Sequence, residues 1–250
     1  MAHGYRNLQH WDHWLAKQFL GKKLLEAEHD LLKKLLTRHL GKHALLIGVP
    51  EQYSLLDTST IPCHTLVTSI LSKEKQTNII ESDLHDLPIA TGSIDLVLMP
   101  HILEFVESPR QLLSEACRIV KPEGLIVVCG FNPTSWWGFK KKLAKDKTVP
   151  WSGHFIPPRS VSGWLHLADF EMEEQRATLF TPPVSEPLYD KLGFFETIGT
   201  RLLPVFGGVY VLVARAKVIP LTPIKLKWKQ QLTGIGISTT ISGHIARNTN

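Results

Sequence analysis

Two short apolar runs, Ile94–Met99 and Leu125–Cys129, stand on either side of a stretch with helical spacing. Only Asp95 interrupts the first run. Apolar residues at consecutive positions are typical of strands covered on both faces, as in a parallel sheet enclosed by helices. The pattern therefore predicts a strand–helix–strand unit, and such a unit is usually right-handed.

The helix between these runs has its own start and stop signals. Ser108 is suited to the N-cap, Pro109 to the first helical position, and Gln111 to the partner position of a capping box. Apolar residues between 112 and 120 share one helical face, and residues 121–124, Lys-Pro-Glu-Gly, end the helix.

Similar patterns predict the remaining elements. An amphipathic helical region, residues 7–40, is expected to break near Gly21 and to cover the sheet with its leucines. Strands are expected at residues 44–47, 63–68, 78–81, 170–180 and 208–214, and further helices at residues 159–168 and 188–200. The alternation of strands and helices favours an α/β fold.

Polar groups gather where the predicted strands end. Asp83 follows one strand, Pro100 and His101 follow the next, and the loop 130–133, Gly-Phe-Asn-Pro, follows the third. Ligands of open parallel sheets bind outside the carboxyl ends of the strands, so this edge is the expected site.

Four linked segments carry a family resemblance: DLHDLPI at 83–89, GSIDLVL at 92–98, HIL at 101–103, and the helix and turn at 112–124. Together they resemble class I S-adenosylmethionine-dependent methyltransferases, in particular the ubiquinone- and sterol-type branch. The resemblance implies a Rossmann-like, seven-stranded, mostly parallel sheet with an antiparallel last strand, helices on both faces and an N-terminal helical cap. Residues 131–138, FNPTSWWG, and 219–222, IPLT, resemble a smaller group of uncharacterised bacterial methyltransferase-like proteins.

The resemblance also implies the cofactor, S-adenosylmethionine, and the residues that hold it. The carboxylate of Asp83 accepts the exocyclic amine of adenine, and the backbone amide of Leu84 meets the ring. Met99, Pro100 and His101 form the floor beside the methionine part. His101 is also the candidate catalytic base for a substrate hydroxyl, because a neutral imidazole near pH 7 can take a proton. The alternative for His101 is an orienting role without proton transfer.

The first half of the domain departs from the family pattern. Of the usual glycine-rich loop only Gly48 is present, to approach the methionine end, and Val49 and Pro50 follow it. Ser69 stands where an acid usually binds the ribose, and a neutral hydrogen bond is weaker than a charge-assisted one. The segment between Ser69 and Asp83 has room for at most one helical turn. Two functions remain open: a methyltransferase of a small-molecule acceptor, or an inactive binding or regulatory protein of the same fold.

Composition narrows the class of protein. The 250 residues, 43% hydrophobic and 20% charged, suit one large α/β domain. We expect no membrane span, no signal peptide and no metal site, and we interpret His10 and His13 as surface residues. Three scattered cysteines are expected to be buried, free thiols in a reducing compartment, which favours the cytoplasm.

The predicted organisation has three parts. Residues 1–40 form a helical cap, residues 41–217 form the α/β domain with cover insertions at 132–158 and 181–207, and residues 218–250 form a flexible basic tail. Trp11, Trp14 and Phe19 are either a lid over the cofactor or core residues, and core packing is favoured. His154 is a second histidine that faces substrate or is structural.

Lysines interleaved with aromatic residues at 136–147 raise a third function, nucleic-acid binding, which is less favoured because the run is short. The oligomeric state stays open.

Overall fold

The computed structural model describes residues 2–70, 78–144, 148–196, 199 and 206–218, with side chains from residue 6 onward except residue 190. The chain divides into one compact unit, Met1–Val218, and a second unit, Ile219–Asn250. The second unit lies outside the described residues, as does the segment 71–77, where a single helical turn is expected. The flexible basic tail therefore stays a prediction.

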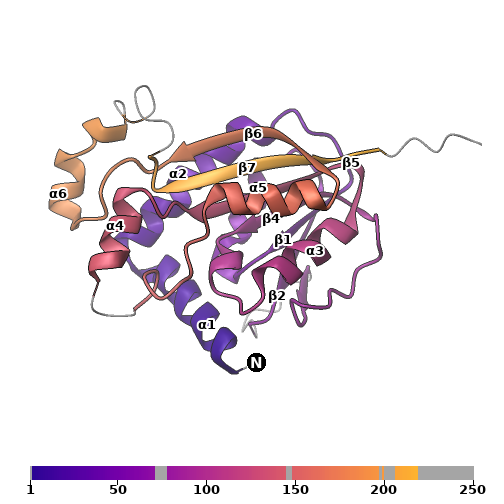
Figure 1. Cartoon of the computed structure of the whole chain (residues 1–250), viewed down its shortest axis with the longest axis horizontal. Helices are drawn as coiled ribbons and strands as arrows, with labels where there is room; N and C mark the ends of the chain where they lie inside the picture. The colour runs from indigo at the N-terminus through magenta and orange to yellow at the C-terminus, as the bar shows by residue number, and fades with distance from the viewer. Residues whose placement is uncertain (1, 71–77, 145–147, 197–198, 200–205, 219–250) are drawn as a thin grey trace, which may run out of the picture. The chain divides into compact units, whose positions relative to one another are not determined.

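Seven strands of the described chain form one sheet in the order β3-β2-β1-β4-β5-β7-β6. The first five strands run parallel, and β7 is antiparallel to both β5 and β6. This confirms the predicted Rossmann-like sheet and its reversed last strand (Figure 1). The strands are β1 His43–Ile47, β2 Cys63–Thr68, β3 Ile79–Glu81, β4 Ile94–Pro100, β5 Val120–Phe131, β6 Phe170–Thr178 and β7 Val209–Ala216.

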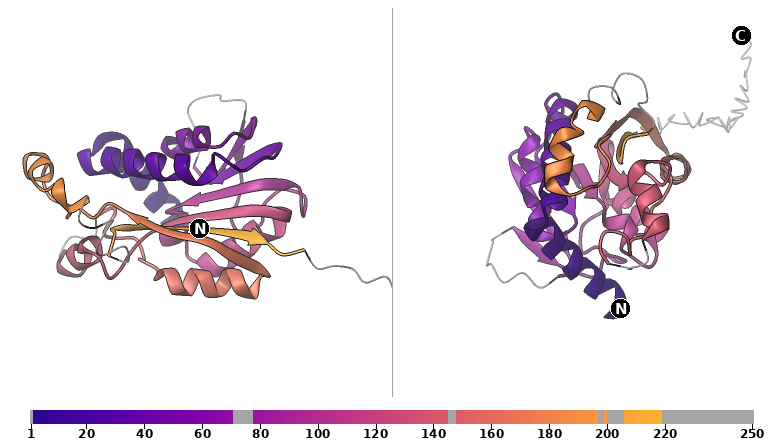
Figure 2. Two further views of the ribbon diagram at one scale, coloured as in Figure 1. Left: turned by 90° about the horizontal axis from the view of Figure 1, so that it is seen from above. Right: turned by 90° about the vertical axis from the view of Figure 1, so that its left-hand side faces the viewer.

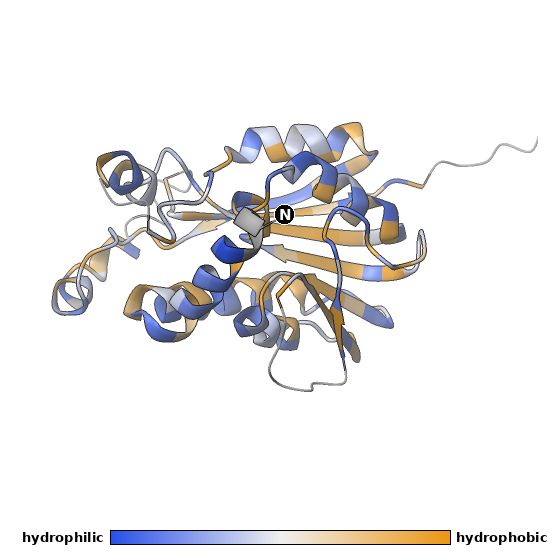
Figure 3. Cartoon of the chain, turned by 90° about the horizontal axis from the view of Figure 1, so that it is seen from below, coloured by the Kyte–Doolittle hydropathy of each residue, from blue (hydrophilic) through white to orange (hydrophobic). Residues whose placement is uncertain are grey.

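Helices cover both faces of the sheet, as expected for strands that are apolar at consecutive positions (Figure 2). The N-terminal helices α1 and α2 lie on one side together with the 3₁₀ helix η1, and α3 and α5 lie on the other. Apolar residues are concentrated in the strands between these layers (Figure 3). The helices are α1 Ala2–Lys17, α2 Phe19–Leu36, η1 Pro50–Thr58, η2 Ile102–Glu104, α3 Pro109–Ile119, α4 Trp136–Leu143, α5 Pro158–Leu167 and α6 Glu186–Lys191.

The helical break predicted at Gly21 is wrong, because the break lies at Gln18 and Gly21 is buried inside α2. A Cβ atom at Gly21 would come within 2.6 Å of the carbonyl oxygen of Trp14 and within 2.8 Å of the Cα of Leu15. Glycine is therefore required for the close approach of α1 and α2, and not for a turn. The leucines of α2 do face the core, but Leu40, beyond the helix, is 91% exposed.

We expect Gly21→Ala to lower the free energy of unfolding by roughly 2 kcal/mol, because overpacking against backbone atoms forces the two helices apart. Gly163→Ala in α5 is the matched control, since a Cβ atom at that position would meet no other atom within 4 Å. That change should raise the free energy of unfolding by about 0.5–1 kcal/mol. Urea denaturation of both variants measures the two effects, and equal stabilisation by both would refute the close approach.

Four local expectations need correction. Ser108 occupies the N-cap of α3, but its side chain accepts no capping hydrogen bond. Helix α3 ends at Ile119, so Val120 belongs to β5, which is longer than the predicted strand. The helix expected at residues 188–200 begins earlier, as α6, and is interrupted by a turn at residues 192–193, after which residues 194–196 and 199 are again helical. Residues 197, 198 and 200 of this range lie outside the described residues. Cys63 is exposed, whereas Cys129 is buried.

Candidate functional site

The predicted cofactor residues follow four adjacent strands. In the sheet order β3-β2-β1-β4, Asp83 and Leu84 follow β3, Ser69 follows β2, Gly48 follows β1, and Met99 and Pro100 end β4. Because these strands are parallel, their carboxyl ends meet at one edge of the sheet. The strand order reverses between β1 and β4, which is where ligands of such sheets bind.

Asp83 lies in a tight turn just beyond β3. Its Oδ1 atom accepts hydrogen bonds from the backbone N–H of His85 and from the His85 ring, both at 3.0 Å. The backbone bond first, and then the ring bond, hold the pKa of Asp83 below its ordinary value. The exposed carboxylate is therefore ionised at neutral pH and available as an acceptor, while the side chain of Leu84 is buried and anchors the turn.

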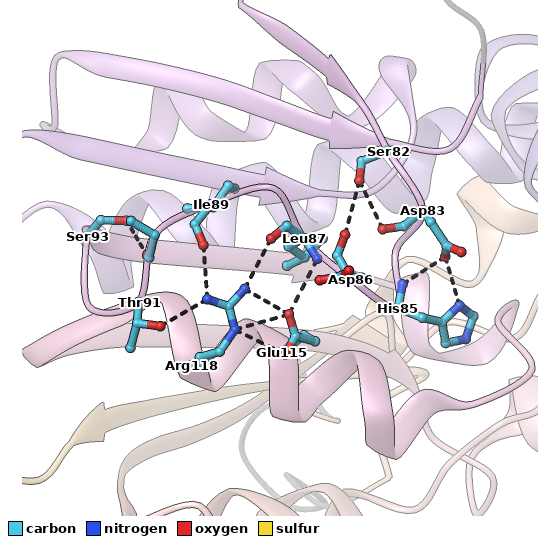
Figure 4. Close-up of polar contacts among 11 residues, drawn as sticks. Ser82, Asp83, His85, Asp86, Leu87, Ile89, Thr91, Ser93, Glu115 and Arg118 are labelled. Carbon is cyan, nitrogen blue, oxygen red and sulfur yellow. Dashed lines mark hydrogen bonds and ion pairs between the residues drawn. The ribbon is translucent and has the colours of Figure 1, made fainter.

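A pair of side chains from α3 holds the segment after this turn (Figure 4). The guanidinium of Arg118 donates to the carbonyl oxygens of Leu87 and Ile89, at 3.1 and 3.0 Å, and is paired with Glu115 at 2.8 Å. A planar guanidinium suits this task because its donors have a fixed geometry. The pair thus fixes the backbone of the segment that follows the Asp83 turn.

The loop after β1 is bridged to the end of β4 by one buried amide. Gln52 Oε1 accepts from the backbone N–H of Val49 at 3.2 Å, and Gln52 Nε2 donates to the carbonyl oxygen of Pro100 at 3.1 Å. A Cβ atom on Gly48 would come within 2.7 Å of Gln52 Oε1. The side chain of Gln52 thus occupies the gap between the two loops, and glycine at position 48 makes room for it.

The end of β2 is held by a neutral hydroxyl. Thr68 is fully buried, and its Oγ1 atom accepts from the backbone N–H of Ile70 at 3.2 Å. Ser69 is half-buried beside it. The backbone N–H of Ser82 donates to the carbonyl oxygen of Thr68 at 3.0 Å, so the turns after β2 and β3 are in contact.

His101 lies beneath this edge in a fully buried cluster. Its Nδ1 atom is 2.8 Å from Oε2 of Glu104. Its Nε2 atom is 2.9 Å from Oε1 of Glu28, which belongs to helix α2. The backbone of His101 is left-handed, with φ of 54°, and its N–H donates to the carbonyl oxygen of Cys129 at 2.9 Å. Glu104 also accepts from the backbone N–H of Phe131.

Two carboxylates decide the charge of this imidazole. Burial alone lowers the pKa of His101, but Glu104 and Glu28 outweigh it and raise the pKa to about 10. Aromatic rings seal the cluster: Phe131 lies 4.2 Å and Trp11 5.4 Å from the His101 ring, centroid to centroid. His101 is therefore an imidazolium at neutral pH, hydrogen-bonded to Glu104 through Nδ1 and ion-paired with Glu28 through Nε2.

This geometry favours the orienting role of His101 over that of a catalytic base. A base needs a free nitrogen within reach of substrate, whereas both nitrogens of His101 face buried carboxylates. His154, the other candidate histidine, is exposed, and its backbone N–H donates to the carbonyl oxygen of Glu104 at 2.7 Å.

Sequence reasoning missed Glu28, Gln52 and Glu104. Glu28 had a signal, because it interrupts the apolar stripe of α2 at the spacing of its buried neighbours. A lone carboxylate on such a stripe indicates a buried partner, since charges are rarely buried unpaired. Gln52 had no comparable signal.

Trp11 is a core residue, as the favoured interpretation of the N-terminal aromatic residues predicts. Its side chain is fully buried and stacks on Trp14 and Phe105 at 5.3 and 4.9 Å. No group of three or more His, Cys, Asp or Glu residues in the described ranges is arranged to bind a metal ion. No helix in these ranges is long and apolar enough to cross a bilayer.

A family model described as a methyltransferase domain matches residues 46–128, a range that contains all seven predicted cofactor residues. Residues 46–128 therefore match a methyltransferase domain, and they contain the strands β2 to β4 and most of β5 of the sheet described above. Such a domain implies S-adenosylmethionine as its cofactor. The exposed, ionised Asp83 fits the adenine end of that cofactor, whereas Gln52 narrows the gap at the end expected for methionine.

Similar proteins leave the methyl acceptor of this chain open. The uncharacterized protein YafS of Escherichia coli (strain K12) is 29% identical over 203 residues, which cover 81% of this chain and 80% of YafS. The malonyl-(acyl-carrier protein) O-methyltransferase of Methylovorus sp. is 24% identical over 56% of this chain and 44% of that protein. The crystal structure of a SAM-dependent methyltransferase from Thermotoga maritima matches the fold with a TM-score of 0.61 and 19% identity, over 85% of this chain and 97% of that one.

Proposed function

We propose that this protein is an S-adenosylmethionine-dependent methyltransferase that acts on an unidentified small-molecule acceptor. One observation carries the proposal: Asp83 presents an exposed, ionised carboxylate at the carboxyl end of β3, held by two hydrogen bonds from His85. A preorganised acceptor at this position suits the exocyclic amine of adenine. The malonyl-(acyl-carrier protein) O-methyltransferase, which is similar to 56% of this chain, is named for methyl transfer.

The other residues of the edge have distinct parts in this proposal. The backbone amide of Leu84 meets the adenine ring, Ser69 reaches the ribose, and Gly48 approaches the methionine end. Met99 and Pro100 form the floor beside the methionine. The cofactor supplies an activated methyl group, so the chain's main contribution is proximity and alignment. His101 supports this floor from below as an imidazolium, since it follows Pro100 directly and is held by Glu28 and Glu104.

The test of this function is calorimetric titration with S-adenosylmethionine, S-adenosylhomocysteine and adenosine. We expect micromolar binding, which needs about 8 kcal/mol. Asp83→Ala should weaken it by about tenfold to a hundredfold, because the variant loses a hydrogen bond to a charged group. Asp86→Ala, three residues further along the chain and also exposed, is the matched control and should leave the affinity unchanged.

A second candidate function is an inactive binding or regulatory protein of the same fold. The buried bridge from Gln52 to Val49 and Pro100 favours it, because this amide fills part of the gap where methionine is expected. In that case adenosine should bind as tightly as S-adenosylmethionine, or neither should bind. A preference for the two methionine-containing ligands over adenosine that is lost in Asp83→Ala supports the methyltransferase instead.

A further inference from the structure

Helix α4 turns three large apolar side chains toward solvent. Trp136, Phe139 and Leu143 are 52%, 55% and 65% exposed. Their spacing of three and four residues puts them on one face of the helix. Trp136 and Phe139 contact each other edge to face, with ring centroids 6.4 Å apart. We name these three residues the α4 face.

The outward direction of the α4 face is fixed by the opposite side of the helix. Trp137 is fully buried, and its Nε1 atom donates to the carbonyl oxygen of Thr181 at 3.3 Å. Gly138 packs so closely on Pro133 that a Cβ atom would come within 2.2 Å of the Pro133 oxygen. Ser135 caps the helix by accepting from the Gly138 N–H at 3.3 Å. The helix cannot turn to bury the α4 face without losing these contacts.

Positive charge accompanies the α4 face. Residues 140–147 contain five lysines and a single acid, Asp146. Lys142 is exposed, whereas Lys140 and Lys141 run over the rings of Trp151 and Phe155. An apolar face with lysines beside it is typical of helices that lie at a membrane surface. Tryptophan in particular is suited to the headgroup region.

Helix α4 lies at one end of the domain with α6, as Figures 1 and 2 both show. The Nζ atom of Lys140 donates to the carbonyl oxygen of Pro183 at 2.6 Å, which ties α4 to the segment before α6. Helix α6 and the residues after it add two half-exposed apolar side chains, Leu188 and Phe194.

We propose that the α4 face docks on the surface of an anionic lipid bilayer. Trp136, Phe139 and Leu143 enter the headgroup region, and Lys142 meets lipid phosphates. A second copy of this chain fits the face less well, because a symmetric contact would bring two lysine-rich segments together. Since α4 follows the carboxyl end of β5, docking brings that edge of the sheet toward the bilayer. If the proposed methyltransferase function also holds, docking implies that the methyl acceptor is a molecule dissolved in the membrane. Vesicle binding tests the docking alone and does not depend on that function.

The experiment is cosedimentation of the full chain with phosphatidylcholine vesicles that contain or lack phosphatidylglycerol. We expect binding to the anionic vesicles that weakens at least about tenfold in the variant Trp136→Ser, Phe139→Ser, Leu143→Ser. The matched control replaces two exposed leucines elsewhere, Leu40 and Leu167, which are 91% and 71% exposed, with serine. This control should bind as the unmodified chain does.

Two further measurements keep the test decisive. Circular dichroism checks that the triple variant is folded, and if it is not, the single exposed change Lys142→Glu should still weaken binding to anionic vesicles. Docking on a bilayer is overturned if the unmodified chain stays in solution or if the triple variant binds equally well. It is also overturned if the triple variant converts a dimer to a monomer, or if the chain binds RNA and not vesicles.

Discussion

His101→Asn should lower the free energy of unfolding by about 3–5 kcal/mol at pH 7, because it leaves two carboxylates buried without their cation. Glu28 and Glu104 lie within 3 Å of the two ring nitrogens, and all three side chains are fully buried. Asparagine is the chosen replacement because it tolerates the left-handed backbone of this position. Urea denaturation measures the loss.

The loss of stability caused by His101→Asn should become smaller as the pH rises. The pKa of His101 is raised from 6.5 to about 10, so its contribution to stability is full below pH 6.5 and is lost as pH rises through 10. The difference between the two proteins should therefore narrow steadily from pH 7 to pH 10. His29→Asn, a half-exposed histidine next to Glu28 on α2, is the control and should cost no more than about 1 kcal/mol. A difference that does not change with pH would contradict the buried imidazolium.

Gln52→Ala should lower the free energy of unfolding by about 3 kcal/mol, because it leaves the Val49 N–H and the Pro100 carbonyl buried without partners. Gln52→Met keeps most of the side-chain volume and removes both hydrogen bonds, so it should cost nearly as much. Thermal or urea denaturation at neutral pH compares the two variants. Glu51→Ala, at the exposed neighbouring position, should change stability by less than about 0.5 kcal/mol. If Gln52→Met is as stable as the unmodified protein, the amide bridge has no stabilising role.

The side chain of Gln52 is expected to affect cofactor binding as well as stability. Its partners lie just after β1 and at the end of β4, where the strand order reverses. The same calorimetric titrations that test the proposed function can be run on Gln52→Ala. Tighter binding of S-adenosylmethionine by the variant would indicate that the amide competes with the methionine part of the cofactor.

The local pattern of the chain was enough to predict most strands and the edge at which their polar ends meet. The pattern located β2 without error and β1, β3 and β4 to within one residue. The signal is continuous in β1 and β4, because these strands are buried along most of their length. The turn that carries Asp83 could be located for the same reason, since it follows directly from the end of a strand. The break at Gly21 could not be predicted correctly, because glycine has the same local signature in a turn and in a close helix contact.

By itself the sequence determined the α/β fold, the order of its strands along the chain and the position of Asp83, because each depends on residues close together in the chain. Only the tertiary structure decided the state of His101 and the role of Gln52. Glu28 is 73 positions before His101 in the chain, and their contact exists only because α2 packs against the loop after β4. The pKa of a buried group depends on partners that are distant in the chain and on the exclusion of water. Neither can be predicted from the residues next to it in the sequence.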